Sequence, residues 1–130
     1  MEERVKAFVD RHWRPLLVAG YLLFFAYLIW SRWANIHAFV LNDTDDNMRM
    51  SQVRAWLNHG QDWFDLRQYK LNWPEGANMH WSRLVDLPLA GLMLLGRLFV
   101  SAPRAEMFAI AVAPIIPLLV LLTGLSLVIR

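Results

Sequence analysis

The stretch Pro15-Leu-Leu-Val-Ala-Gly-Tyr-Leu-Leu-Phe-Phe-Ala-Tyr-Leu-Ile-Trp30 contains no charged residue. With Trp13 and Trp33 as interfacial anchors, it predicts a helix of about 21 residues, roughly 30 Å long, which matches the hydrocarbon core of a bilayer. A cleaved signal peptide is the alternative, because a basic segment precedes the run. The run is bulky and aromatic, however, and no small-x-small cleavage site follows it. We therefore expect a transmembrane helix at residues 15–33.

The composition agrees with a membrane protein. The chain has 130 residues, of which 57% are hydrophobic, and its mean hydropathy is +0.30. Soluble domains are usually about 45–50% apolar. The absence of cysteine excludes disulfides and thiolate metal sites. A net charge of +2 without a long basic run excludes nucleic acid as an expected partner.

Two further apolar runs follow a polar middle region. Residues 84–100 form the weaker run, because it includes Arg97 and is shorter than the helix of about 21 residues predicted around the first run. Residues 107–129 carry no charge over 23 residues, which is long enough to cross a bilayer. Pro114 and Pro117 remove backbone donors within this run, so a kink is expected there. The fold class predicted is an all-α integral membrane protein with about three transmembrane helices.

The basic residues predict the orientation. They crowd the first fourteen residues, and Arg97 and Arg104 flank the short turn between the second and third runs. By the positive-inside rule, both regions are expected in the cytoplasm. The predicted layout is a cytoplasmic or interfacial segment 1–14, a transmembrane helix 15–33, a helical extracytoplasmic loop 34–83, a second transmembrane helix 84–100, a cytoplasmic turn 101–106 and a third transmembrane helix 107–129.

An acidic cluster opens the predicted loop helix, in the string Asp43-Thr44-Asp45-Asp46-Asn47-Met48-Arg49. Thr44 or Asp45 is expected to cap a helix that His59-Gly60 ends. Arg49 lies four residues after Asp45 and so shares its face and supports the helix. Acids at a helix start are favoured by about 0.3–1 kcal/mol each, which is the structural interpretation of the cluster.

The functional interpretation is that three neighbouring carboxylates exceed what one cap requires. Asp43, Asp45 and Asp46 repel one another unless a cation compensates them. Oxygen ligands of this kind suit Mg²⁺ or Mn²⁺, so the three residues are candidate metal ligands.

A second group of polar residues immediately precedes the 84–100 run. Arg83 is expected at headgroup depth, where it could bind the phosphate of a lipid, with His80 as a second hydrogen-bond donor. An ordinary juxtamembrane anchor of Trp and Arg is the alternative. In that case Asp86 pairs with Arg83, three residues before it. Pro74-Glu75-Gly76 predicts a turn within the loop.

The acidic string and the layout around it resemble the membrane glycosyltransferases of the GT-C superfamily. The string is similar to the first acidic motif of oligosaccharyltransferase catalytic subunits and of related bacterial sugar transferases. In that family an acid of the first loop acts as base on the acceptor or binds a metal. The resemblance therefore implies that Asp43 or Asp45 is catalytic.

The resemblance also implies a substrate and a location. Such enzymes transfer a sugar from a polyprenyl-phosphate-linked donor to an acceptor outside the cytoplasm. The expected location is the bacterial inner membrane, with the N-terminus cytoplasmic and the acidic loop periplasmic. Members have many more spans, so we expect the rest of the enzyme or other membrane subunits as partners, besides membrane lipids. The Trp-Trp-Asp acceptor motif of oligosaccharyltransferases is absent from this sequence.

The rival hypothesis is a small, non-enzymatic three-span protein that binds a partner or a lipid. A metal-ion transporter is excluded because its acids would lie within a span. The sequence contains no glycine-rich phosphate loop, no His-Glu-x-x-His and no Gly-x-Ser-x-Gly motif.

Overall fold

The fold was established from a computed structural model, which describes residues 2–41 and 43–128. Residue 129 of the predicted third span lies outside this part of the chain. The elements, in order, are α1 (Glu2–Ser31), α2 (Trp33–His37), α3 (Thr44–His59), β1 (Arg67–Gln68), β2 (Ala77–Asn78), the 3₁₀ turn η1 (Arg83–Val85), α4 (Asp86–Arg97), α5 (Ala102–Val112) and α6 (Ile115–Val128). The prediction of a mainly helical chain is confirmed. A short antiparallel hairpin of β1 and β2 was not expected.

Helix α1 combines the predicted interfacial segment with the first predicted span. Its backbone leaves helical geometry at His12, where φ is −117°. Pro15 explains this kink, because its ring clashes with the preceding turn and it donates no hydrogen bond. No described residue of α1 is buried. The helix contacts α6 through a hydrogen bond of 3.0 Å between the Tyr21 and Ser126 hydroxyls, and its Ile29 packs against the core of the other helices.

Helices α5 and α6 form the second long apolar segment, with a break at residues 113–114, where Pro114 lies. The predicted kink is therefore present. The segment Ala102–Val128 and helix α1 are long and apolar enough to cross a membrane, with mean hydropathies of 2.5 and 1.4. Little of either is buried: 0% of the most apolar window of α1 and 11% of that of Ala102–Val128.

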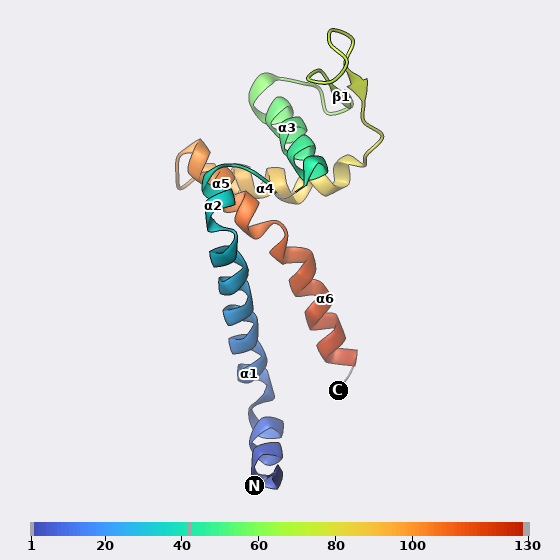
Figure 1. Cartoon of the computed structure of the whole chain (residues 1–130). Helices are drawn as coiled ribbons and strands as arrows, with labels where there is room; N and C mark the ends of the chain where they lie inside the picture. The colour runs from blue at the N-terminus through green and yellow to red at the C-terminus, as the bar shows by residue number, and fades with distance from the viewer. Residues whose placement is uncertain (1, 42, 129–130) are drawn as a thin grey trace.

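Helix α4 differs from the second predicted span. It contains 12 residues, which gives a length of about 18 Å. Figure 1 shows it running across the direction of α1, with α1 and α6 extending to one side and α3 lying on the other. The predicted turn 101–106 also differs: α5 begins at Ala102, because Ser101 is extended and Pro103 suits a first helical turn.

Helices α2, α3 and α4 and the hairpin form a compact head, and α5, the first part of the second long segment, packs against it. Its core is built from apolar side chains of four helices: Ile36, Met50, Val53, Ala90, Met93, Ala109 and Ile110. Polar contacts connect the same helices. Arg54 pairs with Glu106, and Arg97 Nη2 donates to Asn58 Oδ1 at 2.6 Å. Helix α3 is thus bound to α4 and α5 by both packing and polar contacts.

Gly96 allows α4 and α5 to approach each other closely. A Cβ placed on Gly96 would lie 3.0 Å from the Cβ and 3.2 Å from the Cα of Ala105. The Cα of Ala105 belongs to the backbone, so α4 and α5 would have to move apart to accept the added Cβ.

We expect Gly96→Ala to lower the free energy of unfolding by about 1–3 kcal/mol, as overpacking does. Gly91→Ala is the matched control, since a Cβ there meets nothing within 4 Å. The control should be neutral or stabilising by up to about 1 kcal/mol. Thermal unfolding in detergent, followed by circular dichroism, measures both; equal behaviour of the two variants would contradict the close packing of α4 on α5.

Candidate functional site

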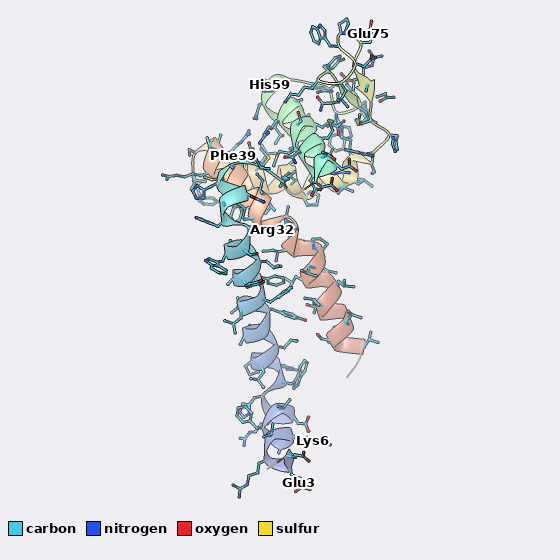
Figure 2. All side chains as sticks on the ribbon, viewed as in Figure 1. Glu3, Lys6, Arg32, Phe39, His59 and Glu75 are labelled. Carbon is cyan, nitrogen blue, oxygen red and sulfur yellow. The ribbon has the colours of Figure 1, made fainter. Side chains whose placement is uncertain are left out.

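A groove of about 650 Å³ lies where α1, α3, α4 and the α5–α6 junction meet. Most of its wall is apolar, with side chains that include Leu28, Ile29, Val85, Leu89, Ile115 and Leu118. Four polar residues also line it: Arg32, Asn35, Asp46 and Arg49. Figure 2 shows Arg32 at the end of α1, where this helix meets the head. The groove thus combines mainly apolar walls with a few charged and polar side chains.

The loop before α3 sets the position of the acidic cluster. Asn47 Nδ2 donates to the Leu41 carbonyl at 2.9 Å, and Asn47 Oδ1 accepts from the Leu41 amide at 3.0 Å. The same Nδ2 donates to the Asp43 carbonyl at 2.6 Å. Asn47 therefore fixes the path from α2 into α3. This role was missed from the sequence, where only the acids and Arg49 of this string drew attention.

The N-cap of α3 is Asp43. Its Oδ1 accepts from the Asp45 amide at 3.4 Å and from Thr44 Oγ1 at 3.2 Å. The sequence prediction placed the cap at Thr44 or Asp45, one or two residues later. Gly60 ends the helix at φ +70°, as predicted, because glycine adopts this left-handed conformation without strain. Asp43 thus has a structural role that accounts for its position.

The three acids differ in what they face. Asp43, Asp45 and Asp46 are all exposed, and only Asp46 lines the groove. Within residues 2–41 and 43–128, no three His, Asp or Glu side chains come together as ligands for a metal. The donor set described here does not fit a three-ligand site, and the binding of Mg²⁺ or Mn²⁺ at the cluster stays a prediction.

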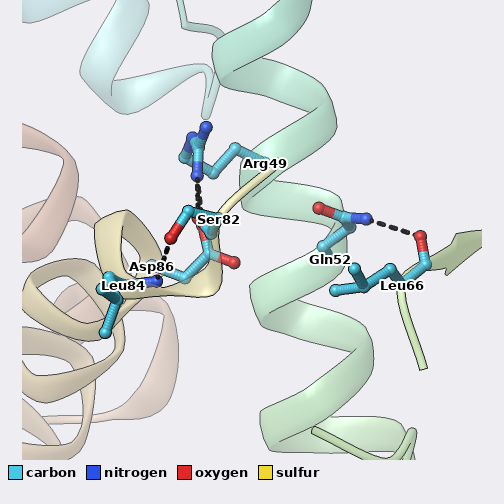
Figure 3. A network of polar contacts seen from close by, with 6 residues as sticks. All are labelled: Arg49, Gln52, Leu66, Ser82, Leu84 and Asp86. Carbon is cyan, nitrogen blue, oxygen red and sulfur yellow. Dashed lines mark hydrogen bonds and ion pairs between the residues drawn. The ribbon is translucent and has the colours of Figure 1, made fainter. Parts of the chain in front are cut away.

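Arg49 connects the acidic helix to the start of α4. Its Nη1 pairs with Asp86 Oδ1 at 2.7 Å and donates to the Ser82 carbonyl at 3.4 Å (Figure 3). The guanidinium also lies 5.3 Å from the centre of the Trp81 ring. Side-chain exposure is 22% for Arg49 and 2% for Asp86. The partner of Asp86 is therefore Arg49, and the predicted pairing with Arg83 is wrong.

Arg83 is the first residue of η1, and its side chain does not line the groove. Its residue exposure is 7%, its Nη2 donates to the Asp65 carbonyl at 2.6 Å, and its guanidinium lies 5.5 Å from the Trp63 ring centre. His80 is exposed and does not line the groove either. The two residues predicted to hold a lipid phosphate are thus not brought to the groove. Gln52 supports the same region by donating to the Leu66 carbonyl at 3.1 Å.

The geometry therefore brings Asp46 and Arg49 together on one wall of an apolar groove. A guanidinium binds phosphate oxygens, and a carboxylate accepts protons, so this pair suits a ligand with a phosphate and a long apolar part. No protein-family model, curated protein or solved structure matches the chain.

Proposed function

We propose that the chain belongs to a membrane glycosyltransferase that moves a sugar from a polyprenyl-phosphate-linked donor to an extracytoplasmic acceptor. The observation that supports this is the groove, whose apolar walls suit a prenyl chain and whose Arg49 guanidinium suits a phosphate. The groove reaches the α5–α6 segment and the end of α1, the two helices with the length and hydropathy of spans. A lipid could therefore enter it sideways.

Arg49 is the residue proposed to bind the donor phosphate. Its contacts to Asp86 and Ser82 both use Nη1. A guanidinium has five N–H donors in a fixed plane, so the Nε and Nη2 groups remain for phosphate oxygens. Asp86 holds this plane in place from the buried side.

Asp46 is the proposed general base, because it is the member of the acidic cluster that lines the groove. The acceptor oxygen attacks the anomeric carbon of the sugar, and the bond from that carbon to the phosphate oxygen breaks. The acceptor proton passes to the Asp46 carboxylate, which accelerates such steps by about 10²–10⁴-fold. Arg49 stabilises the charge that develops on the departing lipid phosphate. Asp43 and Asp45 are proposed to position this carboxylate at the helix start.

The proposed location is the bacterial inner membrane, with the N-terminus in the cytoplasm and the head in the periplasm. The donor, the surrounding lipids and further membrane segments or subunits are the proposed partners. Mg²⁺ or Mn²⁺ enters no step above, because the described residues offer no three-ligand site.

A photoreactive lipid tests the groove. The probe is undecaprenyl monophosphate with a diazirine in the isoprene unit next to the phosphate, added to membranes containing the complete protein. We expect labelling of groove residues such as Ile29, Leu89 and Ile115. Arg49→Lys should reduce labelling about tenfold, because an ammonium keeps the charge opposite Asp86 but loses the planar grip on phosphate.

The control is Arg54→Lys on the same helix, whose side chain pairs with Glu106 and does not line the groove. It should leave labelling unchanged. Labelling confined to residues outside the groove, or equal loss in both variants, would show that the groove is not the lipid site.

A lipid-binding protein without transferase activity is the second candidate. Two observations favour it: Asp43 is accounted for as an N-cap, and the cluster forms no three-ligand group in the described part of the chain. Photolabelling of the groove without any transfer of sugar would select this candidate.

A further inference from the structure

We propose that α4 lies along the membrane surface, with one apolar face against lipid acyl chains and both ends on the side of the head. It would then not be a span, and the turn after it would not be cytoplasmic. The proposal does not depend on the glycosyltransferase function.

Length is the first reason. The 12 residues of α4 extend about 18 Å, whereas crossing a hydrocarbon core takes about 30 Å. The chain on either side does not lengthen the helix: η1 precedes it, and residues 98–101 are not α-helical. Tilting would shorten the reach of α4 across the bilayer further.

The faces of α4 provide the second reason. Its buried residues, Asp86, Ala90, Met93 and Gly96, share one face, which packs toward α3 and α5. The opposite face is exposed and carries no charge; its large side chains are Leu87, Leu94 and Leu95. Leu84 of η1 and Leu98 just after the helix are exposed as well. Leu98 is the most exposed of these residues, at 75%. A helix that has one exposed apolar face and contacts polar groups through its other face is typical of the membrane–water interface.

Contacts at both ends of α4 provide the third reason. Arg49 of α3 binds Asp86 at its start, and Asn58 of α3 accepts from Arg97 at its end, at 2.6 Å. Helix α3 is rich in charged residues and cannot itself cross a bilayer. Because one such helix reaches both ends of α4, those ends lie on one side of the membrane.

Arg97, one of the two basic residues that predicted a cytoplasmic turn, has a partner in the head. Arg97 reaches Asn58, and Arg54 of α3 pairs with Glu106 just after the turn. The turn between α4 and α5 is therefore attached to α3, the helix that the layout predicted outside the cytoplasm.

Lipid is the occupant that the surroundings of this face favour. Figure 1 shows α1 and α6 extending from the same side of α4, opposite to α3 and the hairpin. Both helices are apolar and largely unburied, so the exposed face of α4 continues their lipid-facing surface. In this arrangement α1 crosses the bilayer once, α5–α6 returns, and the head stays on one side.

Spin labels at two depths test the proposal directly, and the absence of cysteine allows single-cysteine variants. Leu87→Cys and Leu98→Cys lie eleven residues apart, about 16 Å along a helix. After nitroxide labelling in liposomes, the depths derived from oxygen and nickel-chelate accessibility should agree within a few Å. Ile116→Cys and Leu127→Cys, with the same spacing in α6, should differ by most of that length.

Three results would overturn the proposal. A large depth difference between labels at 87 and 98 would make α4 a span. Strong nickel-chelate access at both would place its face in water, and exclusion of both reagents would mean that protein covers it.

A second measurement does not depend on substitutions in α4 or α6. A membrane-impermeant maleimide should label Ser101→Cys from the same side as Asn72→Cys in the hairpin, and from the side opposite to Glu3→Cys. Labelling of Ser101→Cys together with Glu3→Cys would restore the cytoplasmic turn.

Discussion

Replacement of Asp46 by Asn is expected to reduce sugar transfer by at least about 100-fold while the protein stays folded. The amide has nearly the same shape as the carboxylate but cannot take the proton of the acceptor. Asp46 is exposed on the first turn of α3, so the change buries no unsatisfied group. Transfer from a radiolabelled polyprenyl-phosphate sugar, measured in membranes with equal amounts of variant and parent protein, gives the ratio directly.

Two further variants separate chemistry from helix capping. Asp43→Ser keeps a side-chain oxygen for the N-cap, and serine caps about as well as aspartate. If Asp43 acts as a cap, this variant should retain transfer within a few-fold, whereas Asp43→Ala should lose about 1 kcal/mol of stability. Full activity of Asp46→Asn, or an equally deep loss in Asp43→Ser, would contradict Asp46 as the base.

Replacement of Asp86 by Ala is expected to cost about 3 kcal/mol in the free energy of unfolding. The Asp86 side chain is 2% exposed and pairs with Arg49 at 2.7 Å, so its removal leaves the Arg49 charge half-buried without a counter-charge. Because Arg49 retains some access to water, the expected cost lies at the lower end of the range for removing one partner of a buried ion pair. Chemical unfolding in detergent, followed by tryptophan fluorescence, measures the difference.

The double variant Arg49→Ala with Asp86→Ala completes a cycle that isolates the pair. It should be more stable than Asp86→Ala alone, since neither charge is then left without its partner. Glu106→Ala serves as the comparison, because the Arg54 side chain is 33% exposed and that pair should contribute about 1 kcal/mol or less. A cost below about 1 kcal/mol for Asp86→Ala would show that the pair does not hold α3 on α4.

The long helices could be predicted because each is determined by its own residues. The uncharged run 15–30, the prolines at 114 and 117 and the left-handed Gly60 act locally, and the structure shows the elements they predict. Helix α4 could not be predicted from its hydropathy. A leucine-rich run of this length has the same composition whether it spans a bilayer or lies along its surface. The packing of α4 depends on contacts with α3 and α5, such as Gly96 against Ala105.

Only part of the candidate site could be predicted, because some of its contacts join residues that are distant in the sequence. The acidic string predicted the start of α3. The resemblance implied Asp43 or Asp45 as the catalytic residue, and Asp46 was predicted only as a candidate metal ligand. The partner of Arg49 is Asp86, 37 residues further along the chain, which no local pattern indicates. Arg83 is turned from the groove because Trp63 and the Asp65 carbonyl meet it there, again through contacts distant in sequence. Local spacing therefore indicated the acids but not the contacts of Arg49, the side chain proposed to bind phosphate.

The proposed glycosyltransferase function is tested most directly by measuring sugar transfer by the complete, unaltered protein in its membrane. Polyprenyl-phosphate sugars, each labelled in the sugar, would be supplied as a panel, and the label would be followed from the lipid phase into product. We expect at least one donor to lose its sugar to an acceptor and Asp46→Asn to abolish this loss. If no donor is used while undecaprenyl monophosphate still labels the groove, the protein binds the lipid without transferring sugar, which would contradict the proposed glycosyltransferase function.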